Sequence, residues 1–119
     1  PPMPRPLCSL SLDLDDMWTY LKTHGDAGWQ EYPSYLETVV PRVLSLLAER
    51  NLRITWFIVG RDASDPRHQR VLRSIADAGH EIGNHSFHHE PWLHLYSEAE
   101  IESELARAED AIEAATGVR

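Results

Sequence analysis

The sequence has only one cysteine, Cys8, among its 119 residues, so no internal disulfide bond can form. The absence of disulfides agrees with a reducing compartment. Cys8 lies in an apolar run that resembles a strand, and we expect it to be buried as an ordinary core residue.

Long apolar runs and a surplus of basic residues are also missing. No run approaches the roughly 20 apolar residues that a membrane span requires, so no span is expected. The N-terminal stretch PPMPRPL lacks the apolar centre of a signal peptide, and we therefore expect a cytoplasmic location. Acidic residues outnumber basic ones by 19 to 11, which argues against nucleic acid as a partner because phosphate-binding surfaces need clusters of Lys and Arg.

The remaining composition is that of a soluble globular protein, with 42% hydrophobic and 25% charged residues. The length suffices for one small domain with a core of its own. We expect a proline-rich segment at residues 1–6 and one domain across residues 7–119.

Three segments are typical of strands. Residues 7–14 alternate between apolar and polar side chains, which predicts a strand whose polar face ends in carboxylates. The run ITWFIV, residues 54–59, predicts a strand buried on both faces, as in a parallel sheet. EIGNH, residues 81–85, predicts a third strand. Between the first two, the aromatic-rich residues 16–37 predict a long ordered loop that can include a short helix.

Helices are expected between and after these strands. Apolar spacing predicts one over residues 39–50, with Thr38 as its cap and Pro41 in its first turn. A second is expected to follow Asp65–Pro66 and to end at Ala78, before Gly79.

The last helix shows a capping box, with Ser97 as N-cap and Glu100 three residues later, and it should end at Gly117. Its buried stripe is predicted to be Ile101, Leu105, Ala108, Ile112 and Ala115. Strands that alternate with helices predict an α/β fold with a parallel sheet. Because three strands are few for such a sheet, we expect the front part of a larger domain.

Carboxylates gather at the end of the first predicted strand. Asp13 and Asp15 share one face of a strand, and Asp16 would point elsewhere. Capping of a turn is the simple explanation for such residues. However, Asp13 interrupts an apolar strand, and a charge buried there needs a partner or a metal. Asp16 stays an alternative to Asp15, because an early end of the strand would remove the alternation.

Histidines crowd the end of the third predicted strand, where five of the seven lie within residues 79–94. His85 and His89 have a spacing that brings two side chains to one side of a helical turn. A surface loop that binds nothing is the simpler alternative for this spacing alone. Two imidazoles and one carboxylate on a divalent cation would explain both clusters and leave positions open for water and substrate. Zinc is the expected metal, although cobalt, nickel and manganese accept the same ligands.

Three motifs, LSLDLDD, ITWFIVG and AGHEIGNHSFHH, together resemble the N-terminal half of the polysaccharide deacetylases, the NodB-homology domain of carbohydrate esterase family 4. The histidine motif of that family is complete over residues 79–89. The first motif is instead similar to the family's less common Asp-x-Asp form. The resemblance implies the front part of a distorted parallel (β/α) barrel, with Asp13 as catalytic base and Asp15, His85 and His89 as metal ligands.

The same resemblance implies a metal-dependent hydrolase that removes an N-acetyl group from a sugar or polysaccharide, with a metal-bound water as nucleophile. The family's later motifs, which supply the general acid, would lie beyond Gly117, so these 119 residues alone are expected to be inactive. Two alternatives stay open. One is a related C–N hydrolase acting on a small cyclic amide or ureide, and the other is a non-catalytic carbohydrate-binding domain of the same fold.

The other aromatic and histidine residues carry weaker expectations. Trp18, Trp29 and Tyr32 could stack on a sugar, although covering the core is an equally good explanation for them. His80 is expected to have a structural role or to support a ligand. His88 should point away from the metal. The sequence leaves the sugar and the oligomeric state open.

Overall fold

Three short parallel strands form the sheet of the computed structural model, which describes all 119 residues. The strands are β1 (Ser11–Leu14), β2 (Thr55–Ile58) and β3 (Glu81–Asn84), and β2 lies between the other two. Leu14 pairs with Ile58 and Ile58 with Asn84, so all three strands end at the same level. The residues that follow β1 and β3 therefore meet at one edge, the carboxyl edge of the sheet.

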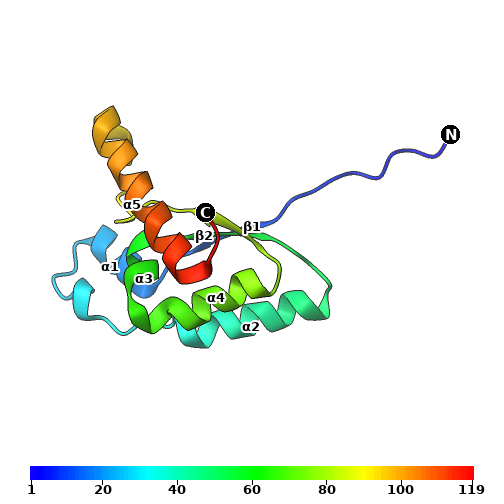
Figure 1. The fold of residues 1–119 in the computed structure, drawn as a ribbon, viewed down its shortest axis with the longest axis horizontal. Coiled ribbons are helices and arrows are strands. Elements are labelled where there is room, and N and C mark those ends of the chain that lie inside the picture. Colours follow the sequence, from blue (N-terminus) through cyan, green and yellow to red (C-terminus); the bar gives the residue numbers. More distant parts are fainter.

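Five helices surround the strands (Figure 1). They are α1 (Met17–His24), α2 (Leu36–Glu49), α3 (Gly60–Ser64), α4 (Gln69–Asp77) and α5 (Glu98–Thr116). Single 3-10 turns are η1 (Trp29–Glu31), η2 (Pro66–His68) and η3 (Leu93–Leu95). None of the helices is both long and apolar enough to cross a membrane. Strands alternating with helices in a parallel sheet confirm the predicted α/β fold.

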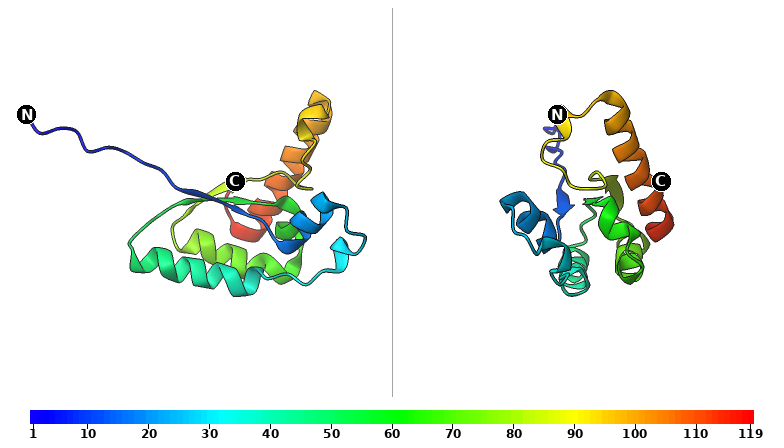
Figure 2. Two further views of the ribbon diagram at one scale, coloured as in Figure 1. Left: turned by 180° about the vertical axis from the view of Figure 1, so that it is seen from behind. Right: turned by 90° about the vertical axis from the view of Figure 1, so that its left-hand side faces the viewer.

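Helices α2 and α4 run side by side against one face of the sheet, and both views of Figure 2 show this layer beneath the strands. Trp56 and Ile58 of β2 point into this layer and are completely buried, together with Leu72 and Ile75 of α4. Phe57 points to the opposite face and is only half-buried. The prediction that residues 54–59 form a strand buried on both faces was therefore wrong.

The first strand is shorter than the alternation predicted. Leu7 and Leu10 are exposed, and Cys8 is exposed rather than part of the core. The reason is topological: pairing with β2 begins only at Ser11 and Thr55, so the preceding residues have no neighbouring strand. Residues 1–10 have no regular structure and extend away from the helices (Figure 1). A domain boundary after residue 6 stays a prediction.

Helix α2 begins three residues before its predicted start. Tyr35 occupies the N-cap position without a side-chain hydrogen bond, so the prediction that Thr38 caps the helix was wrong. Pro41 consequently lies in the second turn, where it removes one backbone hydrogen bond to Glu37. The completely buried Leu36 anchors this early start.

Helix α3 follows β2 directly and was not predicted, since apolar periodicity cannot be recognised over five residues. Gly60 begins it, and a Cβ atom there would lie 2.7 Å from Phe87 Cδ2 and 2.7 Å from Ala108 Cα. Only glycine allows α3, α5 and the loop after β3 to approach this closely. The predicted second helix is split into η2 and α4, which ends at Asp77.

Helix α5 begins and ends as predicted. Ser97 and Glu100 form both hydrogen bonds of the capping box, and Gly117 ends the helix with φ 77°. Its buried face differs from the expected stripe, because Leu105 is 39% exposed whereas Glu104 is only 7% exposed. A carboxylate thus occupies a buried position on this helix.

Candidate metal centre

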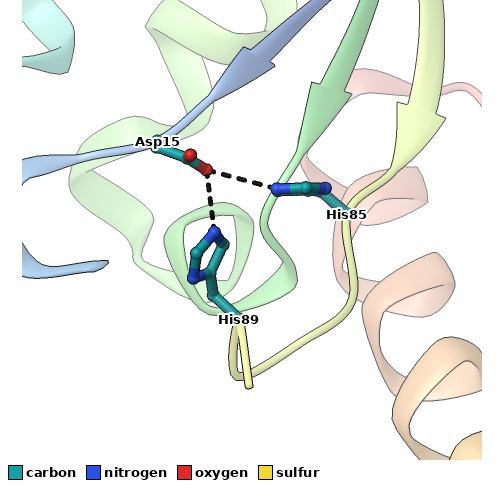
Figure 3. A group of neighbouring side chains, drawn as sticks. All are labelled: Asp15, His85 and His89. Carbon is teal, nitrogen blue, oxygen red and sulfur yellow. Dashed lines mark ion pairs between the residues drawn. The ribbon is translucent and has the colours of Figure 1, made fainter. Parts of the chain in front are cut away.

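Asp15 and His85 each directly follow a strand, and the shared register of the strands brings them together at the carboxyl edge (Figure 3). Asp15 Oδ1 lies 3.3 Å from His85 Nε2 and 3.2 Å from His89 Nε2. All three side chains are partly buried, and their ligand atoms lie within 4.8 Å of one another. The structure thus brings together the three residues expected as metal ligands.

Asp15 Oδ1 is buried and has no hydrogen-bond partner, although two imidazole nitrogens lie so near. Two ligand atoms at about 2.0–2.2 Å from a tetrahedral zinc ion are roughly 3.3–3.5 Å apart, close to the observed spacing. The buried, unpaired oxygen and the two nitrogens therefore fit a divalent cation.

The electrostatics of these side chains favour an anionic carboxylate. Burial acts to raise the pKa of Asp15, but the nearby imidazoles of His85 and His89 outweigh it and lower the pKa well below its ordinary range. In return, the Asp15 carboxylate raises the pKa of His85 above its ordinary value, against the opposing effect of burial. A carboxylate that stays ionised and faces imidazole nitrogens is a suitable donor set for zinc.

Asp13 lies on the same face of the chain as Asp15 but is more open to solvent. Its Oδ2 is 3.8 Å from His85 Nε2, and its side chain is 57% exposed. The carboxylate is thus beside the proposed ligands and accessible to a water molecule.

Asp16 points away from this group and serves the fold. Its Oδ1 accepts hydrogen bonds from the backbone N–H of Met17 (2.9 Å) and of Tyr35 (3.2 Å), so it caps α1 and fixes the entry to α2. Tyr35 also donates its hydroxyl hydrogen to the carbonyl oxygen of Asp15. Asp16 is only 2% exposed and its Oδ1 already accepts two hydrogen bonds, so the geometry favours Asp15 as the ligand.

The two histidines lie in a loop just after β3, and not on the helical turn that their spacing would also suit. Residues 85–89 form an irregular loop, which we call the histidine loop, and both Ser86 and His89 have positive φ, 61° and 50°. Such a conformation costs a non-glycine residue on the order of 1–3 kcal/mol and persists only where the surroundings impose it. The histidines therefore converge through tertiary contacts and not through helical geometry.

Helix α3 provides one set of these contacts. The backbone N–H groups of Gly60 and Arg61, at the start of the helix, donate to the carbonyl oxygens of Ser86 (2.8 Å) and Phe87 (3.0 Å). The close approach that Gly60 permits thus allows α3 to form these two hydrogen bonds with the histidine loop.

Glu104 of α5 and Lys22 of α1 provide the other contacts. Glu104 Oε1 accepts from the backbone N–H of Phe87 (3.1 Å) and of His88 (2.5 Å), and Oε2 lies 2.8 Å from His88 Nδ1. On the other side of the loop, Lys22 Nζ donates to the carbonyl oxygen of His88 (2.9 Å) and to Glu90 (3.1 Å). His88 is therefore turned away from the candidate metal centre, as expected.

Neither Glu104 nor Lys22 was predicted from the sequence as a residue that supports the site. For Glu104 a signal existed: it lies four residues before Ala108 and eight before Ile112, on the face that those two residues bury. A charged residue on a buried face requires partners. Lys22 gives no comparable signal, since a lysine on a short helix is ordinary.

The aromatic residues expected to bind sugar differ in exposure. Trp18 is only 7% exposed, donates its indole N–H to Asp62 Oδ1 (2.8 Å) and packs edge-on against His89. The guanidinium of Arg61 stacks over both Trp18 and Trp29, 4.6 Å from each ring. Tyr32 is 53% exposed. Sugar binding by these residues stays a prediction, and exposure favours Trp29 and Tyr32 over Trp18.

Asp62 and His80 are two further buried titratable groups. Burial raises the pKa of Asp62 to about 6, and its Oδ2 has no hydrogen-bond partner. His80 Nδ1 accepts a hydrogen bond from the backbone N–H of Ile54 (3.1 Å), and burial lowers its pKa. His80 thus joins the segments before β2 and β3 at the opposite end of the sheet, which is a structural position.

The fold and the site together define a parallel α/β protein with an Asp–His–His group at the carboxyl edge of its sheet. The sequence profile of the family described as Polysaccharide deacetylase matches residues 10–119, and the chain belongs to this family. This result confirms the resemblance in the sequence motifs.

Individual relatives agree with this assignment. The chain is 32% identical over 83 residues to peptidoglycan-N-acetylmuramic acid deacetylase PdaA of Bacillus subtilis, covering 70% of the chain and 30% of that protein. A Mycobacterium smegmatis structure described as a polysaccharide deacetylase superposes with a TM-score of 0.77 at 34% identity, over 92% of the chain and 39% of that structure. The chain therefore spans about a third of the length of these relatives.

A third similar structure is a family 4 pseudoenzyme from Bacillus anthracis. It superposes with a TM-score of 0.67 at 28% identity and covers 93% of the chain and 32% of that structure. The fold of this family thus exists both in deacetylases and in at least one protein described as a pseudoenzyme. The site residues, and not the fold, must carry any argument about activity.

Proposed function

We propose that this chain carries the metal centre of a metal-dependent hydrolase that removes an N-acetyl group from a sugar or polysaccharide. Asp15, His85 and His89 would hold the cation, with zinc as the expected metal. The observation that supports this most strongly is the buried Asp15 Oδ1, which has no hydrogen-bond partner yet lies 3.2 and 3.3 Å from two imidazole nitrogens.

When bound, a divalent cation would polarise an acetyl carbonyl and make a water molecule more acidic. Asp13 would accept the proton of the attacking water on its carboxylate, because that group is exposed and lies on the same side as the three ligands. Asp15 would stay ionised, because the adjacent imidazoles lower its pKa. We propose that the acid that protonates the leaving amine lies outside residues 1–119.

The proposed substrate is a carbohydrate that bears N-acetyl groups. The Bacillus subtilis relative is named for its action on N-acetylmuramic acid in peptidoglycan, which supports a polymer of this chemical class. Trp29 and Tyr32 are accessible enough to contact a sugar ring.

The direct test uses the full-length protein, loaded with zinc and then treated with a chelator. We expect stoichiometric zinc, release of acetate from an N-acetylglucosamine oligomer, and loss of this activity after chelation. Asp13→Asn should lower kcat by roughly 100-fold or more while zinc content is retained, because a base contributes about that factor.

The same test separates the proposal from a non-catalytic domain, which the likeness to a pseudoenzyme makes a specific alternative. Full zinc content without acetate release from any N-acetylated sugar would favour the alternative. Absence of zinc in a folded protein would contradict the metal centre itself.

A further inference from the structure

The backbone of residues 86–88 has a hydrogen-bond partner for each of its six polar groups, although the segment has no regular structure. The three N–H groups are bound by side-chain oxygens, and the three carbonyls by two helix N–H groups and one ammonium group. The partners are Asn84 Oδ1, Glu104 Oε1 twice, Gly60 N–H, Arg61 N–H and Lys22 Nζ. Because every backbone polar group of this irregular segment has a hydrogen-bond partner, we infer that the neighbouring residues impose its conformation.

We propose that Glu104 is a positioning residue that holds the histidine loop in the conformation that presents His85 and His89 to one cation, with Lys22 as a weaker second clamp. This inference rests on the proposed function, since it assigns Glu104 a role toward the metal ligands. Glu104 does not touch the cation position; it acts through the backbone of Phe87 and His88.

The position of Glu104 in the chain makes this role specific. Its carboxylate binds two successive backbone N–H groups between the two histidines, together with the ring of His88. The next residue, His89, has φ 50°, a conformation that non-glycine residues seldom adopt. Without Glu104, the two amides would be left unpaired in a buried place, and the loop would turn to reach water, which would move His89.

Lys22 contacts the same peptide segment from the opposite side. Its ammonium group is mostly buried, with a side chain 19% exposed, and donates to the carbonyl of His88 while pairing with Glu90. An anion therefore binds the N–H groups of the loop and a cation binds one of its carbonyls. Charge-assisted hydrogen bonds of this kind are stronger than neutral ones.

The test compares Glu104→Ala, Glu104→Gln and the matched control Glu102→Ala in the full-length protein. Glu102 lies two residues earlier on the same helix and is exposed. The measurements are the zinc Kd, from competition with a chelator, the visible spectrum of the Co²⁺-loaded protein, and the hydrogen exchange of the Phe87 and His88 amides relative to that of Ile58.

We expect Glu104→Ala to weaken zinc binding by roughly 10- to 100-fold, as removal of a group that orients metal ligands does. It should also speed exchange at Phe87 and His88 more than at Ile58. Glu104→Gln keeps an acceptor for both amides and should restore most of the affinity. Lys22→Met should have a smaller effect in the same direction, and Glu102→Ala none.

Two results would overturn the inference. Unchanged zinc affinity in Glu104→Ala, with faster exchange at Phe87 and His88, would leave Glu104 a purely structural role. Equal acceleration of exchange at Ile58 would show general destabilisation instead of a local clamp. Wild-type protein that binds no zinc would instead contradict the proposed function, and the exchange data would then still report whether Glu104 fixes the loop.

Discussion

The candidate metal centre has two sides that are built in different ways. The carboxylate side, Asp13 to Asp16, spans the end of the regular strand β1, and a helix cap fixes its last residue. The histidine side, residues 85–89, is an irregular loop held by α1, α3 and α5. Local geometry positions the carboxylates, whereas contacts from residues distant in the sequence position the histidines. Substitutions on the two sides should therefore differ in their effects on zinc affinity and on stability.

The largest effect is expected from a pair of substitutions on the carboxylate side. Asp15→Asn removes the charge of the proposed ligand and should weaken zinc binding by more than about 100-fold, beyond the effect of losing an outer partner. Asp16→Asn should leave zinc binding nearly unchanged, because asparagine is an equally good helix cap. The zinc Kd of both variants is the measurement, and an equal loss in both would contradict the assignment of Asp15.

The second-largest effect is expected from a substitution next to the histidine loop. A methyl group in Gly60→Ala would lie 2.7 Å from both Phe87 Cδ2 and Ala108 Cα, so α3 and the histidine loop must separate. Overpacking of this kind lowers the free energy of unfolding by about 1–3 kcal/mol, and zinc binding should weaken with it. Gly28→Ala is the matched control, since no atom lies within 4 Å of its added Cβ. Urea denaturation measures both, and a wild-type midpoint for Gly60→Ala would be evidence against the tight contact.

A smaller effect is expected at Asp62, which links the two sides through Trp18, since Trp18 contacts His89. Its pKa is raised from 3.8 to about 6, mainly by burial, while Asp16 adds to the rise and His68 and Arg61 oppose it. The folded state thus holds this proton more tightly than the unfolded state. Wild-type stability from this group is complete below pH 3.8 and is lost as the pH rises through about 6.

Asp62→Asn keeps an acceptor for Trp18 and removes the buried charge. We expect it to stabilise the protein by about 2–3 kcal/mol more at pH 8 than at pH 4, since the pKa shift of about two units corresponds to about 1.4 kcal/mol per unit. Thermal unfolding at the two pH values measures the difference. A flat profile for Asp62→Asn would contradict the raised pKa of Asp62.

The smallest effect is expected at the capping box of α5, the helix that carries Glu104. Ser97→Ala removes the acceptor for the Glu100 N–H (3.2 Å) and should cost about 1 kcal/mol of stability. Because the cap lies two turns before Glu104, zinc affinity should stay close to wild type. A large loss of affinity would indicate that the histidine loop depends on the whole helix and not on one side chain.

The same contrast explains what could be predicted from the sequence. Alternation along residues 11–14 and the capping box at Ser97 are local patterns, and the structure agrees with both. Strand alternation does not separate Asp15 from Asp16, because β1 ends at Leu14; the role of Asp16 as the cap of α1 separates them. The contacts of the histidine loop could not be predicted, because they depend on Glu104 and Lys22, which are 16 and 66 residues away from His88. The spacing of His85 and His89 would suit a helical turn, but the two residues converge in a loop, and spacing alone does not report the tertiary contacts that shape it.

All backbone N–H and carbonyl groups of residues 86–88 form hydrogen bonds within the protein, and this affects how the site would release and rebind a metal ion. Small zinc domains collapse when their metal is removed, because the ion supplies the folding energy. In this chain the loop shape is maintained by an internal carboxylate and an internal ammonium, which remain whether or not a cation is present. Stripping the protein of metal should therefore leave a preorganised receptor that reloads without refolding, and that accepts whichever suitable divalent ion the surroundings offer.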